Sequence, residues 1–187
     1  MTKKHIITIA GLPGSGKSST AQGVATMLGY EHFSSGDLFR KMAAERGISV
    51  EEMNYAAEKQ QQIDRDVDEM LVKMGKEKNN LVIDSRMAFH WMPRSFKVFL
   101  DLDLDTAAQR TLANIQKKGR VSQEGSSFED VREKTAQRLV SEKKRYYNLY
   151  GVDVTDKKHF DLVIDTGKQD LQSVVSIVVE GYQKWLS

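Results

Sequence analysis

The chain of 187 residues has a hydrophobic fraction of 40%, a charged fraction of 29%, a formal net charge of +2 and no cysteine. A chain of this size is expected to fold as a single domain, spanning 1–187, with a core of its own. The lack of cysteine excludes disulfides and cysteine-ligated zinc, and the small net charge gives no reason to expect a nucleic-acid or membrane partner. No apolar run reaches the length of a signal sequence or a membrane span, so we expect a cytoplasmic protein. We also expect a monomer.

The first motif is a strand, a glycine-rich loop and a helix in direct succession. Residues 5–10 form a short, apolar, isoleucine-rich run, which is typical of a buried parallel strand. The next eight residues match the pattern G-x-x-x-x-G-K-[ST] at every fixed position. They are Gly11, Leu12, Pro13, Gly14, Ser15, Gly16, Lys17 and Ser18, and Ser19 follows them. The spacing of apolar residues then predicts a helix over 18–28, which Gly29 ends.

Each part of this loop suits a polyphosphate. The glycines let the backbone curl so that its N–H groups point inward, Lys17 supplies a mobile positive charge, and the Ser18 hydroxyl can hold a magnesium ion. A glycine-rich turn that binds nothing is the alternative, but it does not account for both the strand before the loop and the helix after it. We therefore predict that residues 11–19 bind a nucleoside triphosphate.

Strands and helices alternate along the rest of the chain, which is typical of an α/β fold with a parallel sheet. Apolar runs predict further strands over 30–34, 81–84, 96–102 and 160–166. Helical patterns cover 38–46, 49–78, 105–118, 128–150 and 170–186. The region 49–78 is very polar in its middle, and we expect it to lie on the surface. The prediction is five parallel strands on one core, flanked by helices.

Polar side chains follow the predicted strands at their carboxyl ends, where ligands collect in open α/β sheets. Asp84 ends the strand over 81–84, and an acid at that point can hold magnesium together with Ser18, directly or through water. The alternative for Asp84 is that it caps the next element. A second acidic group follows the strand over 96–102 and is expected to include the N-cap of the next helix. Its members are Asp101, Asp103 and Asp105.

Two arginines lie just past two different strands. Arg40 comes after Ser35, Gly36 and Asp37, and Arg86 comes after Asp84 and Ser85. Arginine binds phosphate or carboxylate well because its planar guanidinium donates two hydrogen bonds at once. A single arginine is ordinarily explained by a surface salt bridge. Two arginines at matching strand ends beside the glycine-rich loop favour a second, anionic substrate.

Positive charge is concentrated between Thr106 and Tyr150. This stretch holds ten basic residues and five acidic ones, whereas the rest of the chain holds 18 basic and 21 acidic residues. A solvated helix face explains such a stretch as well as a phosphate clamp does, and both interpretations stay open at this point.

These motifs together resemble the nucleoside monophosphate kinases, and more narrowly the small cytidylate kinases of the archaeal type. The similarity covers nearly the whole chain. It is carried by the glycine-rich loop and by the residues at 35–40, 63–65, 84–86, 144–146, 150–153 and 161–166. The chain departs from the family pattern after the third strand, where Asp84 and Ser85 stand in place of a glutamate and a glycine.

The resemblance implies a P-loop NTPase fold with a monophosphate-binding segment at about 35–78 and a lid at about 111–137. It implies transfer of the γ-phosphate of ATP to CMP or dCMP with Mg²⁺, with Lys17 on the β- and γ-phosphates and with Ser18 and Asp84 in the magnesium shell. The residues implied for the acceptor are Ser35, Gly36, Asp37, Arg40, Asp64 and Arg86. Those implied for the transferring phosphoryl group, beside Lys17, are Arg110, Arg120, Arg138 and Arg145.

Two other functions stay open. One is a P-loop kinase for another small acceptor, such as AMP, shikimate or a metabolite alcohol. Shikimate-type kinases share an acid at the place of Asp37, although Ser35 and Gly36 with Arg40 favour a monophosphate. The other is a nucleotide-dependent regulatory module, which would hydrolyse ATP slowly without regard to an acceptor.

The roles of four further residues are less specific than those above. His90 and Trp91 could shape a base pocket or belong to the core. Gly119 and Gly125 are candidate points of flexure within the lid.

Overall fold

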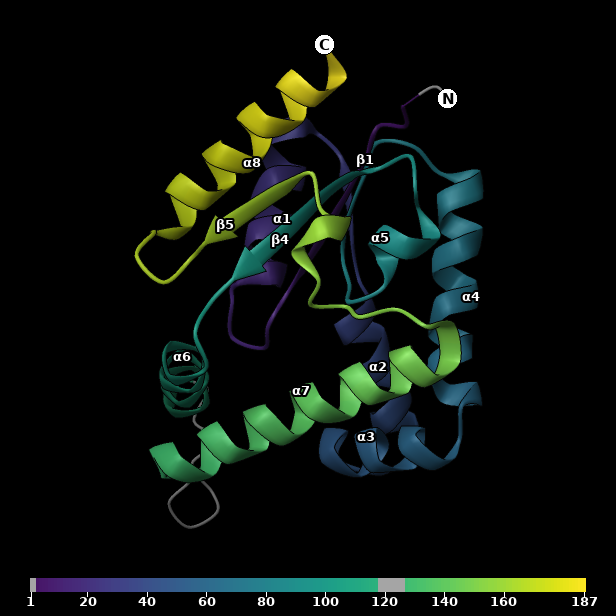
Figure 1. Ribbon diagram of the computed structural model, residues 1–187, viewed down its shortest axis with the longest axis vertical. Coiled ribbons are helices and arrows are strands. Elements are labelled where there is room, and N and C mark those ends of the chain that lie inside the picture. The colour runs from purple at the N-terminus through teal and green to yellow at the C-terminus, as the bar shows by residue number, and fades with distance from the viewer. Residues whose placement is uncertain (1–2, 118–126) are drawn as a thin grey trace.

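The computed structural model describes residues 3–117 and 127–187. At its centre is a parallel sheet of five strands in the order β2-β3-β1-β4-β5 (Figure 1). The strands are β1 Ile6–Gly11, β2 Glu31–Ser34, β3 Leu81–Asp84, β4 Phe96–Asp101 and β5 Leu162–Asp165. The predicted α/β class and the five predicted strands are confirmed.

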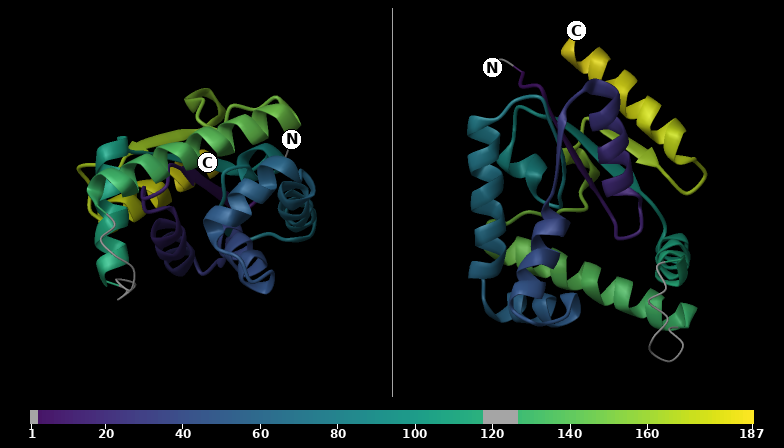
Figure 2. Two further views of the ribbon diagram at one scale, coloured as in Figure 1. Left: turned by 90° about the horizontal axis from the view of Figure 1, so that it is seen from below. Right: turned by 180° about the vertical axis from the view of Figure 1, so that it is seen from behind.

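Helices pack on both faces of this sheet and across one of its ends (Figures 1 and 2). In the described residues they are α1 Lys17–Leu28, α2 Ser35–Glu45, α3 Val50–Lys59, α4 Gln62–Glu77, α5 Ala88–Trp91, α6 Leu104–Lys117, α7 Phe128–Tyr150 and α8 Leu171–Leu186, with a short 3-10 turn η1 at Lys157–His159. None of the helices described is both long and apolar enough to cross a membrane.

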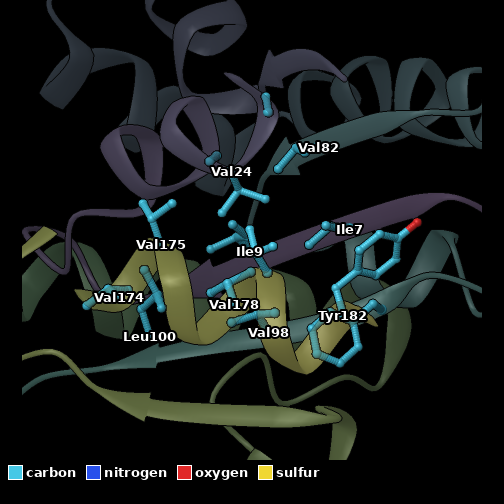
Figure 3. Close-up of a cluster of buried hydrophobic side chains, with 14 of the residues drawn as sticks. Ile7, Ile9, Val24, Val82, Val98, Leu100, Val174, Val175, Val178 and Tyr182 are labelled. Carbon is cyan, nitrogen blue, oxygen red and sulfur yellow. The ribbon is translucent and has the colours of Figure 1, made fainter. Parts of the chain in front are cut away.

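The larger core lies between the sheet and the pair α1 and α8 (Figure 3). Ile7 and Ile9 of β1 point to this side and pack with Val24 of α1 and Val178 of α8. Ile6 lies on the other side of β1, in the second core. Because β1 is covered on both faces, its sequence is a continuous apolar run and does not alternate with polar residues.

The second core lies on the opposite face of the sheet, under α4 and α5. Ile6 and Ile83 of the sheet pack there with Leu71 of α4 and with Ala88 of α5, and all four side chains are buried. α4 therefore belongs to the core along one side, and only its other side faces water.

α7 crosses the carboxyl ends of the strands and does not cover a face of the sheet (Figures 1 and 2). It packs against α6 near one end and against α3 near the other. Its side chains can therefore reach the edge of the sheet at which ligands collect in such folds.

The prediction of helical structure over 49–78 is confirmed, but the prediction that the region lies on the surface was wrong. The chain forms two helices there, because Gln60 leaves the helical conformation with φ −121° and ψ 87°. The region is also not wholly on the surface, since Ile63 and Leu71 are buried. No glycine or proline marks the break, and it allows α3 and α4 to pack in different directions against Ala43 and the sheet.

Local signals at helix ends were interpreted correctly. Gly29 ends α1 with φ 68°, a left-handed conformation that glycine adopts without strain. Asp103 caps α6, since its carboxylate accepts from the Thr106 backbone N–H at 2.8 Å. The short α5 and η1 were not predicted, because neither is long enough to show a period.

Candidate functional site

The glycine-rich loop lies against two other elements. A Cβ on Gly11, which has φ 148°, would come within 2.4 Å of the Leu100 carbonyl oxygen in β4. A Cβ on Gly14, with φ 78°, would come within 2.6 Å of the Ala107 carbonyl oxygen in α6. α1 begins directly after the loop at Lys17, so the partial positive charge of its N-terminus faces the same space.

Lys17 turns back over its own loop. Its Nζ donates to the Leu12 carbonyl oxygen at 2.7 Å. Desolvation lowers the pKa of Lys17 well below its ordinary value, and the nearby charges of Arg86 and Arg138 lower it further, while Glu142 and Asp84 act in the other direction. In the described part of the chain, no carboxylate lies within ion-pair distance of this ammonium. Such a cation suits an anionic ligand.

Asp84 is the centre of a small hydrogen-bond network behind the loop. Its Oδ2 accepts from Ser18 Oγ at 2.5 Å and from Ser34 Oγ at 3.1 Å. Its Oδ1 lies 2.9 Å from His32 Nε2, and its backbone oxygen accepts from Ser35 Oγ at 3.3 Å. The structure thus brings together Ser18 and Asp84, the two residues predicted for the magnesium shell.

Glu142 joins two of the predicted arginines. One carboxylate oxygen accepts from Arg86 Nε at 2.6 Å, and the other accepts from Arg138 Nε at 2.8 Å. Burial by itself would raise the pKa of Glu142, but the two guanidinium groups outweigh it and lower the pKa to about 2. Arg86 also donates to the Gly11 carbonyl oxygen at 2.6 Å, which links this group to the glycine-rich loop.

Arg145 is paired with Asp64 from α4. Its Nε donates to Asp64 Oδ2 at 2.8 Å, and its Nη1 donates to Ser141 Oγ at 2.9 Å. Both members of the pair are buried. Burial raises the pKa of Asp64 from its ordinary value, although the Arg145 charge opposes that shift. The pair joins α7 to α4 directly.

Of the other predicted arginines, the structure describes Arg110 and Arg40, and both line the site. Arg110 Nη2 donates to the Thr166 carbonyl oxygen at 2.6 Å, which ties α6 to the end of β5. Arg40 is exposed and pairs with Asp37 within the first turns of α2. Arg120 lies outside the described residues, as do Gly119 and Gly125.

One cleft of about 960 Å³ brings these groups together at the carboxyl ends of the strands. Of the predicted site residues that the structure describes, all line the cleft except Gly11, Leu12 and Ser15, which lie within the loop itself. Residues from positions as distant as the glycine-rich loop, α2, α4 and α7 therefore share one space, as a site for two substrates requires.

His90 and Trp91 lie elsewhere. The Trp91 ring packs edge-on against Tyr150 with centroids 5.0 Å apart, and it borders a second groove that is lined mainly by side chains of α4, Asp68 among them. His90 is exposed and packs beside Trp91. These positions favour the interpretation as packing residues over that of a base pocket.

Comparisons with known proteins show the family to which the chain belongs. Residues 10–147 match a family model described as an AAA domain. A cytidylate kinase from Haloarcula marismortui is 37% identical over 183 residues, which are 96% of this chain and 90% of that protein. A cytidylate kinase from Pyrococcus abyssi is 39% identical over 92% of this chain and 91% of that protein. The chain belongs to the cytidylate kinase family.

Solved structures of P-loop kinases share the fold. A shikimate kinase from Acinetobacter baumannii, in complex with shikimate, superposes with a TM-score of 0.60 at 16% identity, over 96% of this chain and 92% of that one. A gluconokinase from Sinorhizobium meliloti gives a TM-score of 0.60 at 15% identity, over 100% and 95% of the two chains. At these identities the likeness concerns the fold alone. The predicted P-loop architecture is confirmed.

Several residues that line the cleft had no predicted role in the site, and Asn54, Glu142 and Tyr146 are among them. Glu142 follows Arg138 by four positions on α7, a spacing that places the two side chains side by side on a helix. That spacing was a usable signal for the pair, but nothing in the sequence placed Arg86 on the same carboxylate.

Glu142→Gln should lower the free energy of unfolding by on the order of 3 kcal/mol at pH 7. This value follows from the pKa of Glu142, which is about 2 in the folded protein and 4.5 ordinarily. The folded-state pKa is depressed, so this stabilisation is fully present above about pH 4.5 and is lost as the pH falls towards 2. The gap between wild type and variant should therefore shrink over that interval. Urea denaturation at pH 7, 4 and 3 measures it, and a gap independent of pH would contradict the role of the ionised carboxylate.

Proposed function

We propose that the protein is a nucleoside monophosphate kinase that transfers the γ-phosphate of ATP to CMP or dCMP, giving ADP and CDP or dCDP. One observation carries the proposal. The glycine-rich loop with Lys17 lines the same cleft as the group Arg86–Glu142–Arg138, although these residues come from distant parts of the sequence. The relatives named cytidylate kinase match over nearly the full chain, which favours CMP or dCMP over shikimate or a metabolite alcohol as acceptor.

On the donor side, the backbone amides of the loop and the N-terminus of α1 bind the phosphates of ATP. Lys17 leaves the Leu12 carbonyl oxygen and pairs with the β- and γ-phosphates. The phosphates supply the negative charge that has no counterpart beside this ammonium in the described structure, and their attraction offsets the desolvation that lowers the pKa of Lys17.

The residues also fit a magnesium ion brought in with the nucleotide. No cluster of three or more histidine or acidic side chains that could hold a metal alone occurs among residues 3–117 and 127–187. Mg²⁺ keeps several waters and takes one or two protein oxygens beside substrate phosphates, so Ser18 and Asp84 suffice. The Ser18 hydroxyl donates a hydrogen bond to Asp84, so its oxygen lone pairs remain available to the cation. The ion would neutralise charge that develops between the β- and γ-phosphates.

On the acceptor side, we assign the phosphate of CMP to Arg40 and Arg86, with Ser35, Gly36 and Asp37 beside them. Asp64, in the first turn of α4, lines the same cleft as Asn54 and Tyr146, and we assign the rest of the nucleotide to this part of it. We place Arg86 and Arg138 beside the transferring phosphoryl group, where negative charge accumulates during the reaction. Stabilising that charge is the main contribution a protein makes to phosphoryl transfer.

We assign to two segments of the chain a movement that closes the cleft over its substrates. Residues 35–78, which fold as α2, α3 and α4, form the monophosphate-binding segment, and 111–137 form the lid, of which the structure describes the end of α6 and the start of α7. Closure would exclude water and direct the phosphoryl group to the acceptor in place of hydrolysis.

The test is to incubate the protein with ATP and Mg²⁺ and to follow ADP formation with CMP, dCMP, UMP, AMP and shikimate in turn. We expect rapid ADP formation with CMP or dCMP, and the labelled γ-phosphate recovered in CDP or dCDP. ADP formed at one rate with every acceptor, or without any, would support the regulatory module instead. ADP formed with shikimate or AMP alone would favour a kinase for another acceptor.

A further inference from the structure

The carboxylate of Asp84 is held on both of its oxygens, and the group that holds Oδ1 has no assigned role. Ser18 and Ser34 donate to Oδ2, at 2.5 and 3.1 Å. His32 Nε2 lies 2.9 Å from Oδ1. An ionised carboxylate only accepts, so Nε2 carries the hydrogen in this bond.

The sheet explains how His32 reaches Asp84. β2 and β3 pair in parallel with Ser34 opposite Asp84 and with His32 opposite Val82. His32 and Ser34 are two residues apart on one strand, so their side chains point to the same face. His32 is therefore a diagonal neighbour of Asp84, and its imidazole is long enough to bring Nε2 to 2.9 Å from Oδ1.

We propose that His32 is a positioning residue for the magnesium shell: its imidazole fixes the orientation of the Asp84 carboxylate so that Oδ2 stays turned towards Ser18 and the cation. Ser18 and Ser34 both bind Oδ2, so they alone leave Oδ1 free and the carboxylate able to rotate about its last bond. The Nε2–H···Oδ1 bond prevents that rotation. His32 itself does not line the cleft, and Asp84 is only 4% exposed, so the effect passes through the carboxylate. This inference rests on the magnesium role proposed for Ser18 and Asp84.

The test measures how much Mg²⁺ tightens the binding of ADP, which needs no acceptor and no turnover. The dissociation constant of ADP is determined by calorimetry with Mg²⁺ and with EDTA, for wild type and for His32→Gln and His32→Asn. The glutamine amide can place its nitrogen near the position of Nε2 and donate to Asp84, whereas the asparagine amide is too short. Glu31→Gln, on the same strand and paired with Lys78 at the surface, is the matched control.

We expect the tightening by Mg²⁺ to fall about tenfold in His32→Asn, the usual size of the effect when a group that orients a metal ligand is lost. ADP binding in EDTA should not change, and His32→Gln and Glu31→Gln should stay within about threefold of wild type. In turnover assays, His32→Asn should need more Mg²⁺ and recover much of its kcat when Mg²⁺ is in excess.

Three results would overturn the proposal. Equal behaviour of His32→Gln and His32→Asn would mean that the Nε2–H bond has no such role. Equal weakening of ADP binding with Mg²⁺ and with EDTA would mean that His32 only supports the fold near the loop. No tightening by Mg²⁺ in the wild type would remove Asp84 and Ser18 from the magnesium shell. Failure of the proposed function is separate, because it shows as an absence of CDP from the wild-type enzyme.

Discussion

Lys17→Met should lower kcat by about 10³-fold or more, equivalent to about 4 kcal/mol of transition-state stabilisation. Methionine keeps an unbranched apolar stem in the loop and removes only the charge that neutralises the transferring phosphoryl group. The ammonium is desolvated and has no carboxylate partner in the described structure, so its loss should not reduce stability. The free energy of unfolding in urea should equal or exceed that of wild type.

The combination of these two readouts is what makes the Lys17 prediction specific. The rate of the chemical step is measured directly by single-turnover transfer to CMP, with the enzyme in excess over ATP and with concentrations that saturate binding. A large drop in stability would mean that the lysine holds the loop together through Leu12. A normal transfer rate would show that the charge of Lys17 is not used in the reaction.

Arg86→Ala should lower kcat/KM for CMP by about 10²–10³-fold, with KM raised and kcat lowered together. The guanidinium is held by Glu142 and by the Gly11 carbonyl oxygen, so it is oriented before substrate arrives. Arg86→Lys keeps the charge but cannot bridge two acceptors in the same plane, and it should recover the activity only in part. Steady-state kinetics with CMP varied at saturating ATP measure both variants.

The controls for Arg86 separate the acceptor from the donor and from the fold. Arg94→Ala, on the exposed loop before β4 at the opposite end of the sheet, should leave all kinetic constants unchanged. ADP affinity should change little in Arg86→Ala. If acceptor kinetics are unchanged, Arg86 does not bind the acceptor phosphate, and if ADP affinity falls as far as kcat/KM does, its main role is to support the glycine-rich loop.

The parts of this molecule that were predictable from sequence are those specified by nearby residues. The glycine-rich loop, the caps at Gly29 and Asp103, and the apolar strand at 81–84 each depend on a short stretch of chain, and each was located within one or two residues. The acid and the arginine after β3 followed from a general property of parallel sheets, that strand ends meet along one edge.

The parts that were not predictable depend on contacts between distant segments. The break at Gln60 has no local signal and follows from how α3 and α4 pack. Glu142 serves Arg86 from 56 positions away in sequence, and His32 serves Asp84 across a strand pairing from 52 positions away. A sequence pattern shows the two residue types, but only the fold shows that they meet.

The pairing of Glu142 with Arg86 and Arg138 has a consequence for turnover. Among the residues that the structure describes, the cleft is lined by six cationic side chains, Lys17, Arg40, Arg86, Arg110, Arg138 and Arg145, and by four carboxylates, Asp37, Asp64, Asp84 and Glu142, and these ten side chains together carry a formal charge of only +2. A phosphate that binds Arg40 or Arg86 must take over an arginine that already has a carboxylate partner. Its binding free energy is then the difference between two ion pairs. The departing product is helped by the same exchange, because the carboxylate reclaims the arginine as the phosphate leaves.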